Sequence, residues 1–177
     1  MYVGVGGWRI DLEWRPGVPR LVPGAALARL ATRPLSASGA PRPASLGLIL
    51  SDDAELASLN AQHMGKKGPT DVLSFPLLPP SAFRDHPGKA PAAAVGHEVF
   101  ALPPHARPHL GDVVVSVERA IDQAAAGRGG QTGDVRWDAR DELRLLVTHG
   151  TLHVCGWDHA EPEEEAAMRE LERRLLG

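Results

Sequence analysis

Three histidines near the C-terminal end of this 177-residue chain constrain its fold more than any other feature. His149 and His153 are four residues apart, and His159 follows three residues after a glycine. Residues four apart on a helix project from one face, one turn above the other. Gly156 can take the left-handed conformation that ends a helix, so the chain can turn back and bring His159 to the same point. The spacing therefore predicts a helix, a tight turn and three converging imidazoles.

Three neutral imidazoles that meet at one point form an open metal site, with the fourth position left for water. The ligand type favours one zinc ion, although imidazole also suits nickel, copper and iron. Such a site predicts metal-assisted hydrolysis. A hydrogen-bond acceptor should orient each imidazole, and the candidates are Asp158, Asp141 and backbone carbonyls. Asp158 has the alternative role of capping the turn.

The residues between the histidines distinguish among classes of hydrolase. The spacing matches the zinc-peptidase pattern HExxHxxGxxH except at Gly150, which stands where peptidases carry the general-base glutamate. Without that carboxylate the usual proton shuttle is missing, so a metallopeptidase is disfavoured. Cys155 could be a fourth ligand, but it should point to another face of the helix and is better interpreted as a small buried residue. Trp157 is expected to pack over the turn.

The bulk properties favour one domain and exclude several classes of protein. The length suits a single sizeable core. The net charge of -3 indicates neither a strongly basic nucleic-acid binder nor an acidic tail, and a local basic patch is compatible with it. The single cysteine excludes an intrachain disulfide and fits a reducing compartment. No signal peptide and no stretch of about 20 apolar residues is visible. We expect a soluble cytoplasmic protein without a membrane partner.

Hydrophobic patterning predicts a mixed α+β chain. Trp8, Ile10 and Leu12 should share the buried face of the first strand, and Asp52 should cap a helix with Glu55 as its capping-box partner. A Pro/Ala-rich stretch at 79–108 is expected to be a mobile surface insertion in a single domain of residues 1–177. The expected strands are 3–14, 46–50, 70–77 and 110–117, the expected helices are 25–35, 52–65, 118–126, 138–155 and 162–176, and the expected loops are 36–43 and 128–133.

The histidine segment resembles the signature of the YbeY family, bacterial metal-dependent endoribonucleases of rRNA maturation. Two further segments are similar and occur in the family's order, and a Glu-rich C-terminal helix also agrees. The similarity covers the chain from about residue 46 to the end. The matching residues are His149-Gly150-x-Leu152-His153-x-x-Gly156-x-Asp158-His159, Leu59-Asn60 with Pro69-Thr70-Asp71-Val72-Leu73-Ser74-Phe75-Pro76, Leu110-Gly111-Asp112-Val113-Val114-Val115-Ser116, and Met168 with Glu170.

This resemblance implies a single-domain α+β fold in which helices pack on a small mixed central sheet. It implies one metal ion, usually zinc, on His149, His153 and His159. It further implies an endoribonuclease that cleaves single-stranded RNA, acts in 3′-end maturation of 16S rRNA and takes part in ribosome quality control. The implied partners are the 16S rRNA precursor and the ribosome or its small subunit.

The chain departs from the family pattern at one position. Members carry Tyr-Arg shortly after the Leu-Asn pair, and that Arg is considered important for activity, whereas His63-Met64 stand here. Met64 is expected to pack, so a guanidinium that could bind a phosphate is missing. Lys66 or Lys67 could reach the same phosphate as point charges, or remain solvated loop residues.

Three residues of the matched segments are further candidates for the site. Asp71, Ser74 and Asp112 recur in the matched segments, and the two carboxylates could orient a ligand, accept a proton or cap turns. The missing Arg also keeps a second hypothesis open, an rRNA- or ribosome-binding assembly factor whose metal is mainly structural. The open geometry of three histidines argues against that alternative.

Overall fold

The computed structural model describes residues 1–87, 106–127 and 138–177. Strands and helices follow one another along the chain largely as the patterning predicts, and three helices follow the last strand. The strands are β1 Tyr2–Val5, β2 Trp8–Trp14, β3 Ala44–Ser51, β4 Val72–Pro76 and β5 His109–Ser116, and the helices are α1 Gly24–Ala37, α2 Asp53–Leu59, the π-helical turn η1 Asn60–Met64, the 3-10 turn η2 Pro80–Ala82, α3 Val117–Ala125, α4 Ala139–Val154 and α5 Pro162–Leu176.

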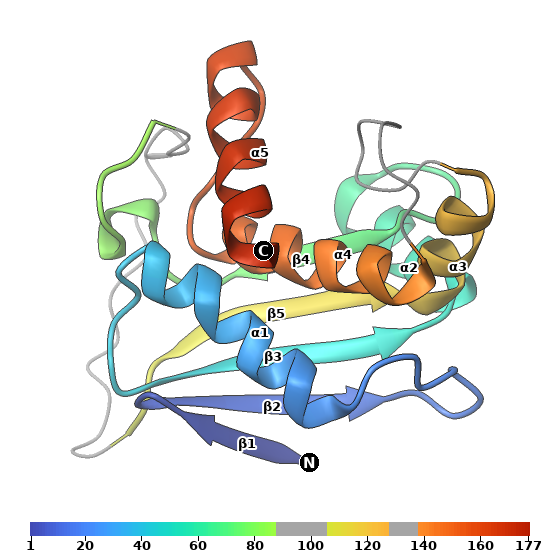
Figure 1. The fold of residues 1–177 in the computed structure, drawn as a ribbon, viewed down its shortest axis with the longest axis horizontal. Helices are drawn as coiled ribbons and strands as arrows, with labels where there is room; N and C mark the ends of the chain where they lie inside the picture. Colours follow the sequence, from blue (N-terminus) through green and yellow to red (C-terminus); the bar gives the residue numbers. More distant parts are fainter. Residues whose placement is uncertain (88–105, 128–137) are drawn as a thin grey trace.

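The strands of the described residues form one mixed sheet in the order β1-β2-β3-β5-β4 (Figure 1). The central strands β2, β3 and β5 are parallel, whereas β1 and β4 pair antiparallel at the two edges. Leu48 of β3 lies opposite Leu12 on β2 and Val113 on β5. The predicted α+β fold with a small mixed sheet is therefore confirmed.

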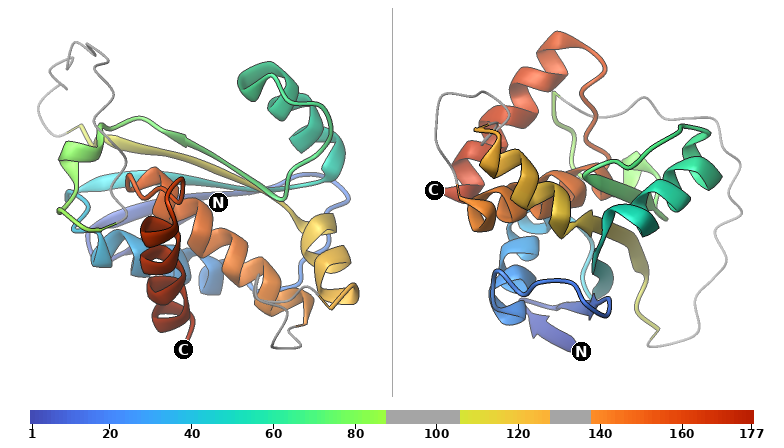
Figure 2. Two further views of the ribbon diagram at one scale, coloured as in Figure 1. Left: turned by 90° about the horizontal axis from the view of Figure 1, so that it is seen from above. Right: turned by 90° about the vertical axis from the view of Figure 1, so that its right-hand side faces the viewer.

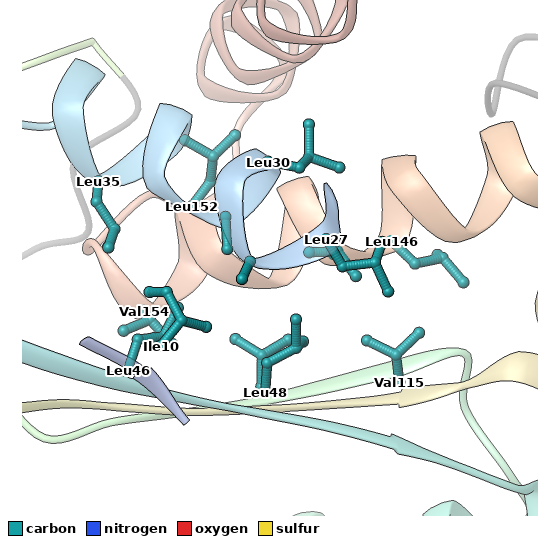
Figure 3. Packing of buried hydrophobic residues seen from close by; sticks show 14 of the residues in the cluster. Ile10, Leu27, Leu30, Leu35, Leu46, Leu48, Val115, Leu146, Leu152 and Val154 are labelled. Atoms are coloured by element: carbon teal, nitrogen blue, oxygen red, sulfur yellow. The ribbon is translucent and has the colours of Figure 1, made fainter. Parts of the chain in front are cut away.

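The main core lies between the sheet and the helices α1 and α4, which cover the same face (Figure 2). Leucines of α1 and α4 point at the aliphatic side chains of β2, β3 and β5 (Figure 3). Burial of one such side chain stabilises the fold by about 1.5–3 kcal/mol. This layer gives α4, the helix of the first two histidines, a rigid support. The labelled core residues are Ile10, Leu27, Leu30, Leu35, Leu46, Leu48, Val115, Leu146, Leu152 and Val154.

The first predicted strand is in fact a hairpin of β1 and β2. Gly6 and Gly7 separate the strands with φ values of 59° and 93°, which a two-residue hairpin turn requires and glycine adopts without strain. Trp8, Ile10 and Leu12 are buried on one face, as the alternation predicts. The prediction of a single strand over 3–14 was wrong because it overlooked this Gly-Gly turn.

The start of α2 confirms one predicted cap and corrects another. The Asp52 side chain accepts the backbone N–H of Glu55 at 2.9 Å, as an N-cap does. Glu55 does not complete a capping box. Its carboxylate instead binds the Arg15 guanidinium at 2.8 and 2.7 Å and accepts the Ser51 hydroxyl. Hydrogen bonds from a charged guanidinium are stronger than one from a neutral backbone N–H, so Glu55 binds Arg15, the residue after β2, in preference to the backbone. Past η1, the helical stretch ends at Gly65, near the predicted stop.

The described part of the expected insertion is not all surface. Phe83 is 5 % exposed and belongs to the main core. A large aromatic side chain gains free energy from burial, which explains why this part of the Pro/Ala-rich stretch packs. Residues 88–105 and the expected loop at 128–133 lie outside the described residues. Within the described ranges, none of the helices combines the length and apolarity of a membrane span.

Candidate metal centre and its groove

The end of α4 delivers the third histidine in the predicted way. The N–H of Gly156 donates to the carbonyl of His153 at 3.0 Å, and that of Trp157 donates to Leu152 at 3.1 Å. These two bonds, with Gly156 at φ 82°, form the Schellman motif that reverses the chain after a helix. The reversal returns His159 to the helix face that carries the other two histidines.

The three imidazoles meet as the spacing predicts. One ring nitrogen from each of His149, His153 and His159 lies within 4.8 Å of the other two. The Nε2 atoms of His149 and His153 are 3.0 Å apart. This cluster could hold a metal ion.

Two hydrogen bonds orient the histidines of α4. The Nδ1 of His149 is 2.7 Å from a carboxylate oxygen of Glu172 on α5, and the Nδ1 of His153 is 2.9 Å from the carbonyl of Trp157. A carbonyl only accepts, so His153 Nδ1 carries the hydrogen. Burial, and then the neighbouring histidines, lower the pKa of His153 to about 4. Its imidazole is therefore neutral at pH 7, and its Nε2 lone pair points at His149.

The cluster fits a metal ion better than a proton. The facing Nε2 atoms of His149 and His153 need a cation between them, because two lone pairs at 3.0 Å repel. A proton can bridge two nitrogens, but the nitrogen of His159 also lies within 4.8 Å of both. Three imidazoles with an open fourth position form the ligand set of catalytic zinc sites. Related divalent transition metals accept the same ligands.

Gly150 lies where α4 packs tightly against β4 and β5. A Cβ at this position would be 2.6 Å from Val113 Cγ1 and 2.8 Å from Val72 Cγ2, too close for either atom. The hydroxyl of Ser74 donates to the Gly150 carbonyl at 2.9 Å and fastens the helix to β4. A glutamate side chain would have no room here, which gives a structural reason for the absence of the peptidase base.

The histidines line a groove of about 840 Å³, which β4 and the residues up to Pro80 border together with two further parts of the chain. We call His149, His153 and the turn 156–159 the histidine wall. We call residues 64–71 the lysine segment, which brings Met64, Lys66, Lys67 and Asp71 to the same groove. The structure thus places the histidine cluster in the same groove as two lysines, whose positive charge suits an anionic substrate.

Comparison with known proteins agrees with this architecture. The family model described as Endoribonuclease YbeY matches residues 25–177. An Endoribonuclease YbeY of Salinispora tropica is 41 % identical over 151 residues, which are 85 % of this chain and 84 % of that protein. This chain belongs to the YbeY family. Its members are endoribonucleases, hydrolases that act on RNA phosphodiester bonds, so the predicted family and class of enzyme are confirmed.

Other YbeY relatives extend the comparison. An Endoribonuclease YbeY of Mycobacterium tuberculosis is 40 % identical over 135 residues, and the match spans 75 % of this chain but 63 % of that longer protein. A Thermotoga maritima protein solved in solution has the same fold, with a TM-score of 0.50 at 20 % identity over 94 % of this chain and 86 % of that one.

Met64, where the resemblance to the family predicts an Arg, does not pack as predicted. Its side chain is 46 % exposed and lines the groove. The small apolar cluster on this side of the sheet is already filled by Leu56, Leu73 and Val114, so Met64 has no core to enter. Lys66 and Lys67 are exposed in the same groove.

The structure brings one carboxylate candidate to the YbeY groove and not the other. Asp71 lines the groove, and its carboxylate also accepts the Val72 N–H at 2.9 Å and the Gln123 amide at 3.1 Å, which ties β4 to α3. Asp112 alternates with the core-facing Val113 along β5, so it points to the other face of the sheet. There its Oδ1 is 3.0 Å from the Nε2 of His109.

The acceptors for the histidines were only partly foreseen. Asp141 contacts Arg144 at 3.4 Å and not a histidine, whereas Asp158 accepts the His159 N–H at 2.8 Å and so caps the turn. Glu172 was missed. Glu172 stands at a position of α5 where the helical spacing of apolar residues predicts another apolar residue. A charged residue at such a position is the one local signal that could have marked Glu172 as part of the site. The residues at this spacing are Met168, Leu171, Glu172 and Leu175.

The packing predictions around the turn are confirmed. Cys155 is fully buried, and desolvation raises the pKa of its thiol to about 12. Trp157 is 7 % exposed, and its indole N–H donates to the Ser38 hydroxyl at 3.1 Å. The Trp157 ring stacks on His86 with 3.8 Å between the ring centroids, at the edge of the groove.

Proposed function

We propose that this chain is a metal-dependent endoribonuclease specific for single-stranded RNA, with one zinc ion on His149, His153 and His159. Its substrate is the 3′ end of the 16S rRNA precursor, its partner is the small ribosomal subunit, and it acts in ribosome quality control in the cytoplasm. The observation that supports the proposal most strongly is that three imidazole nitrogens within 4.8 Å line the same groove as two lysines. Family membership supports RNA as the substrate.

The residues of the groove divide the work of phosphodiester cleavage. Lys66 and Lys67 bind the phosphate and neutralise the charge that develops on it, as mobile point charges in place of the family's guanidinium. When bound, the metal ion supplies Lewis acidity at the phosphate. His153 stays neutral at physiological pH because burial lowers its pKa to about 4, so it remains available as a ligand.

The size of the groove favours an unpaired strand. Its volume of about 840 Å³ is in the range of small-ligand pockets, about 300–1,000 Å³. A short stretch of unstacked nucleotides can enter such a groove, whereas a duplex presents its bases only at the edges of its own grooves.

The test compares three preparations of the purified protein: zinc-loaded, chelator-treated, and chelator-treated then reloaded. Each is incubated with a single-stranded RNA that carries the 16S 3′-end sequence and with the same RNA annealed to its complement. We expect cleavage of the single strand by the first and third preparations alone. Equal cleavage by the chelated protein would overturn the metal dependence, and equal cleavage of the duplex would overturn the strand specificity.

The exposed Met64 supports one alternative, an rRNA-binding assembly factor with a mainly structural metal. In that case the zinc-loaded protein binds the same RNA and small subunits without cutting. Binding with no cleavage above the metal-free control, under conditions in which a YbeY relative with the full motif cleaves, would establish this alternative.

A further inference from the structure

Glu172 is a buried carboxylate in the contact between α5 and α4. The residue is 4 % exposed, and it lies beside Met168 and Leu171, the buried apolar residues of α5. Burial of a carboxylate costs several kcal/mol unless a close partner offsets it. Its partner is the Nδ1 of His149, 2.7 Å away.

This contact decides which nitrogen of His149 faces the cluster. A ring nitrogen that donates its hydrogen to a carboxylate leaves the other nitrogen free to act as a ligand. His153 gains the same orientation from the Trp157 carbonyl, within the turn that follows its own helix. His149 depends on α5, a separate helix whose Glu172 is 23 residues away in sequence.

We propose that Glu172 is a positioning residue of the metal centre, and that through it metal binding and the docking of α5 stabilise each other. The inference rests on the metal of the proposed function. A metal ion on His149 would polarise the imidazole and strengthen the hydrogen bond that its Nδ1–H donates to Glu172. Thermodynamic reciprocity then requires that the docked helix strengthen metal binding by the same factor.

The first test measures the zinc affinity of Glu172→Gln by competition with a chromophoric chelator. Glutamine keeps the size of the side chain and removes its charge, and circular dichroism checks that the fold is retained. Because substitution of such orienting partners weakens metal binding about 10–100-fold, we expect a loss in that range. Glu170→Gln, at an exposed position two residues away on α5, is the matched control and should bind zinc as the wild type does. Wild-type affinity in Glu172→Gln would overturn the proposal.

A spectroscopic readout separates positioning from a general loss of stability. In the zinc-loaded, ¹⁵N-labelled protein, the Nδ1 hydrogen of His149 should resonate further downfield than that of His153, because its acceptor is a closer carboxylate. Glu172→Gln should move the His149 signal upfield and leave the His153 signal in place. Movement of neither signal, or of both equally, would contradict a role specific to His149.

The closing experiment follows amide hydrogen exchange in α5 of the wild-type protein with and without zinc. We expect zinc to slow exchange over Pro162–Leu176 and to have a smaller effect on this helix in Glu172→Gln. If zinc binds to the wild type and exchange in α5 does not change, the coupling is overturned and the proposed function stands. If the wild type binds no zinc, the proposed function and this inference fall together.

Discussion

The histidine wall and the lysine segment line the same groove but differ in how firmly they are held. The histidine wall stands on α4, whose apolar side packs on the sheet, and its imidazoles are aimed by bonds to Glu172 and to the Trp157 carbonyl. The lysine segment consists mainly of exposed residues. A buried asparagine holds it, since the Asn60 side-chain amide donates to the Gly68 carbonyl at 2.9 Å.

This difference matches what each side has to do. Metal ligands must be held within about 0.5 Å of the productive geometry, which only a packed and hydrogen-bonded support provides. A lysine that neutralises a phosphate acts as a point charge on a flexible stem and tolerates displacement. We therefore expect substitutions in the histidine wall to act steeply and those in the lysine segment to act gradually, and the five predictions below test that contrast.

The largest effect should come from His153→Ala. The loss of one of three imidazoles removes the metal, so cleavage of single-stranded RNA should fall to the background of the chelated protein. Elemental analysis of the purified variant should find no bound zinc. Full activity in a metal-free His153→Ala protein would refute the assigned role of the histidine wall.

Acid should destabilise the metal-free protein through the same histidine. The pKa of His153 is lowered from 6.5 to about 4 in the folded chain. Between these pH values the unfolded chain binds a proton at His153 that the folded chain does not. The contribution of His153 to stability is therefore complete above pH 6.5 and is lost as the pH falls to 4. The free energy of unfolding should drop by up to about 3 kcal/mol over this range. Urea titrations of the wild type and His153→Asn measure it. An equal drop in both proteins would assign the effect to other groups.

The double substitution Lys66→Ala, Lys67→Ala should lower cleavage about 10- to 100-fold and leave zinc binding unchanged. Its remaining activity should depend less on salt, since two exposed charges are gone. Arg140→Ala, which removes an exposed charge at the far end of α4, serves as the control. A loss of zinc from the double variant would show that the two sides are not independent.

Gly150→Ala should destabilise the fold by about 1–3 kcal/mol, because the added methyl group collides with two valines of the sheet. Chemical denaturation of the metal-free protein gives the value. The same change at Gly4, where a Cβ meets nothing within 4 Å, should have little effect on packing. Equal stability of the two variants would mean that α4 is less firmly seated than the structure indicates.

The smallest effect should be a gain. Met64→Arg restores a guanidinium in the groove and should raise the rate of cleavage about three- to tenfold at unchanged zinc content. Met64→Leu, which keeps an apolar side chain, should leave the rate as it is. No gain in Met64→Arg would mean that the two lysines already provide the charge that the phosphate needs.

The sequence alone predicted the features that depend on neighbours along the chain. The helix of His149 and His153 and the turn at Gly156 follow from local spacing and backbone conformation. The Gly6-Gly7 hairpin was a local signal too, and it was overlooked. Such features need no knowledge of the rest of the fold.

The remaining features depend on contacts between distant segments. Glu172 reaches His149 from another helix, and Glu55 binds Arg15, which follows β2 and is 40 residues away in sequence. The face on which Asp112 lies could not be predicted, because Val113, Val114 and Val115 are all apolar and only tertiary packing shows which of them face the main core. Tertiary packing decides such pairings, and one sequence records only the residue types.

What keeps this scaffold from peptidase chemistry is the tight packing around the Cα of residue 150, and not its set of metal ligands. The three imidazoles are common to both chemistries, so a single codon change at residue 150 would be enough to introduce the general base. A carboxylate at that position would need space that Val72 and Val113, on two neighbouring strands, now occupy. Replacing either valine by a smaller residue opens a destabilising cavity until the glutamate and both smaller residues are present together. A stepwise route between the two activities therefore passes through less stable proteins, and an engineered conversion should begin in the sheet and not at the metal.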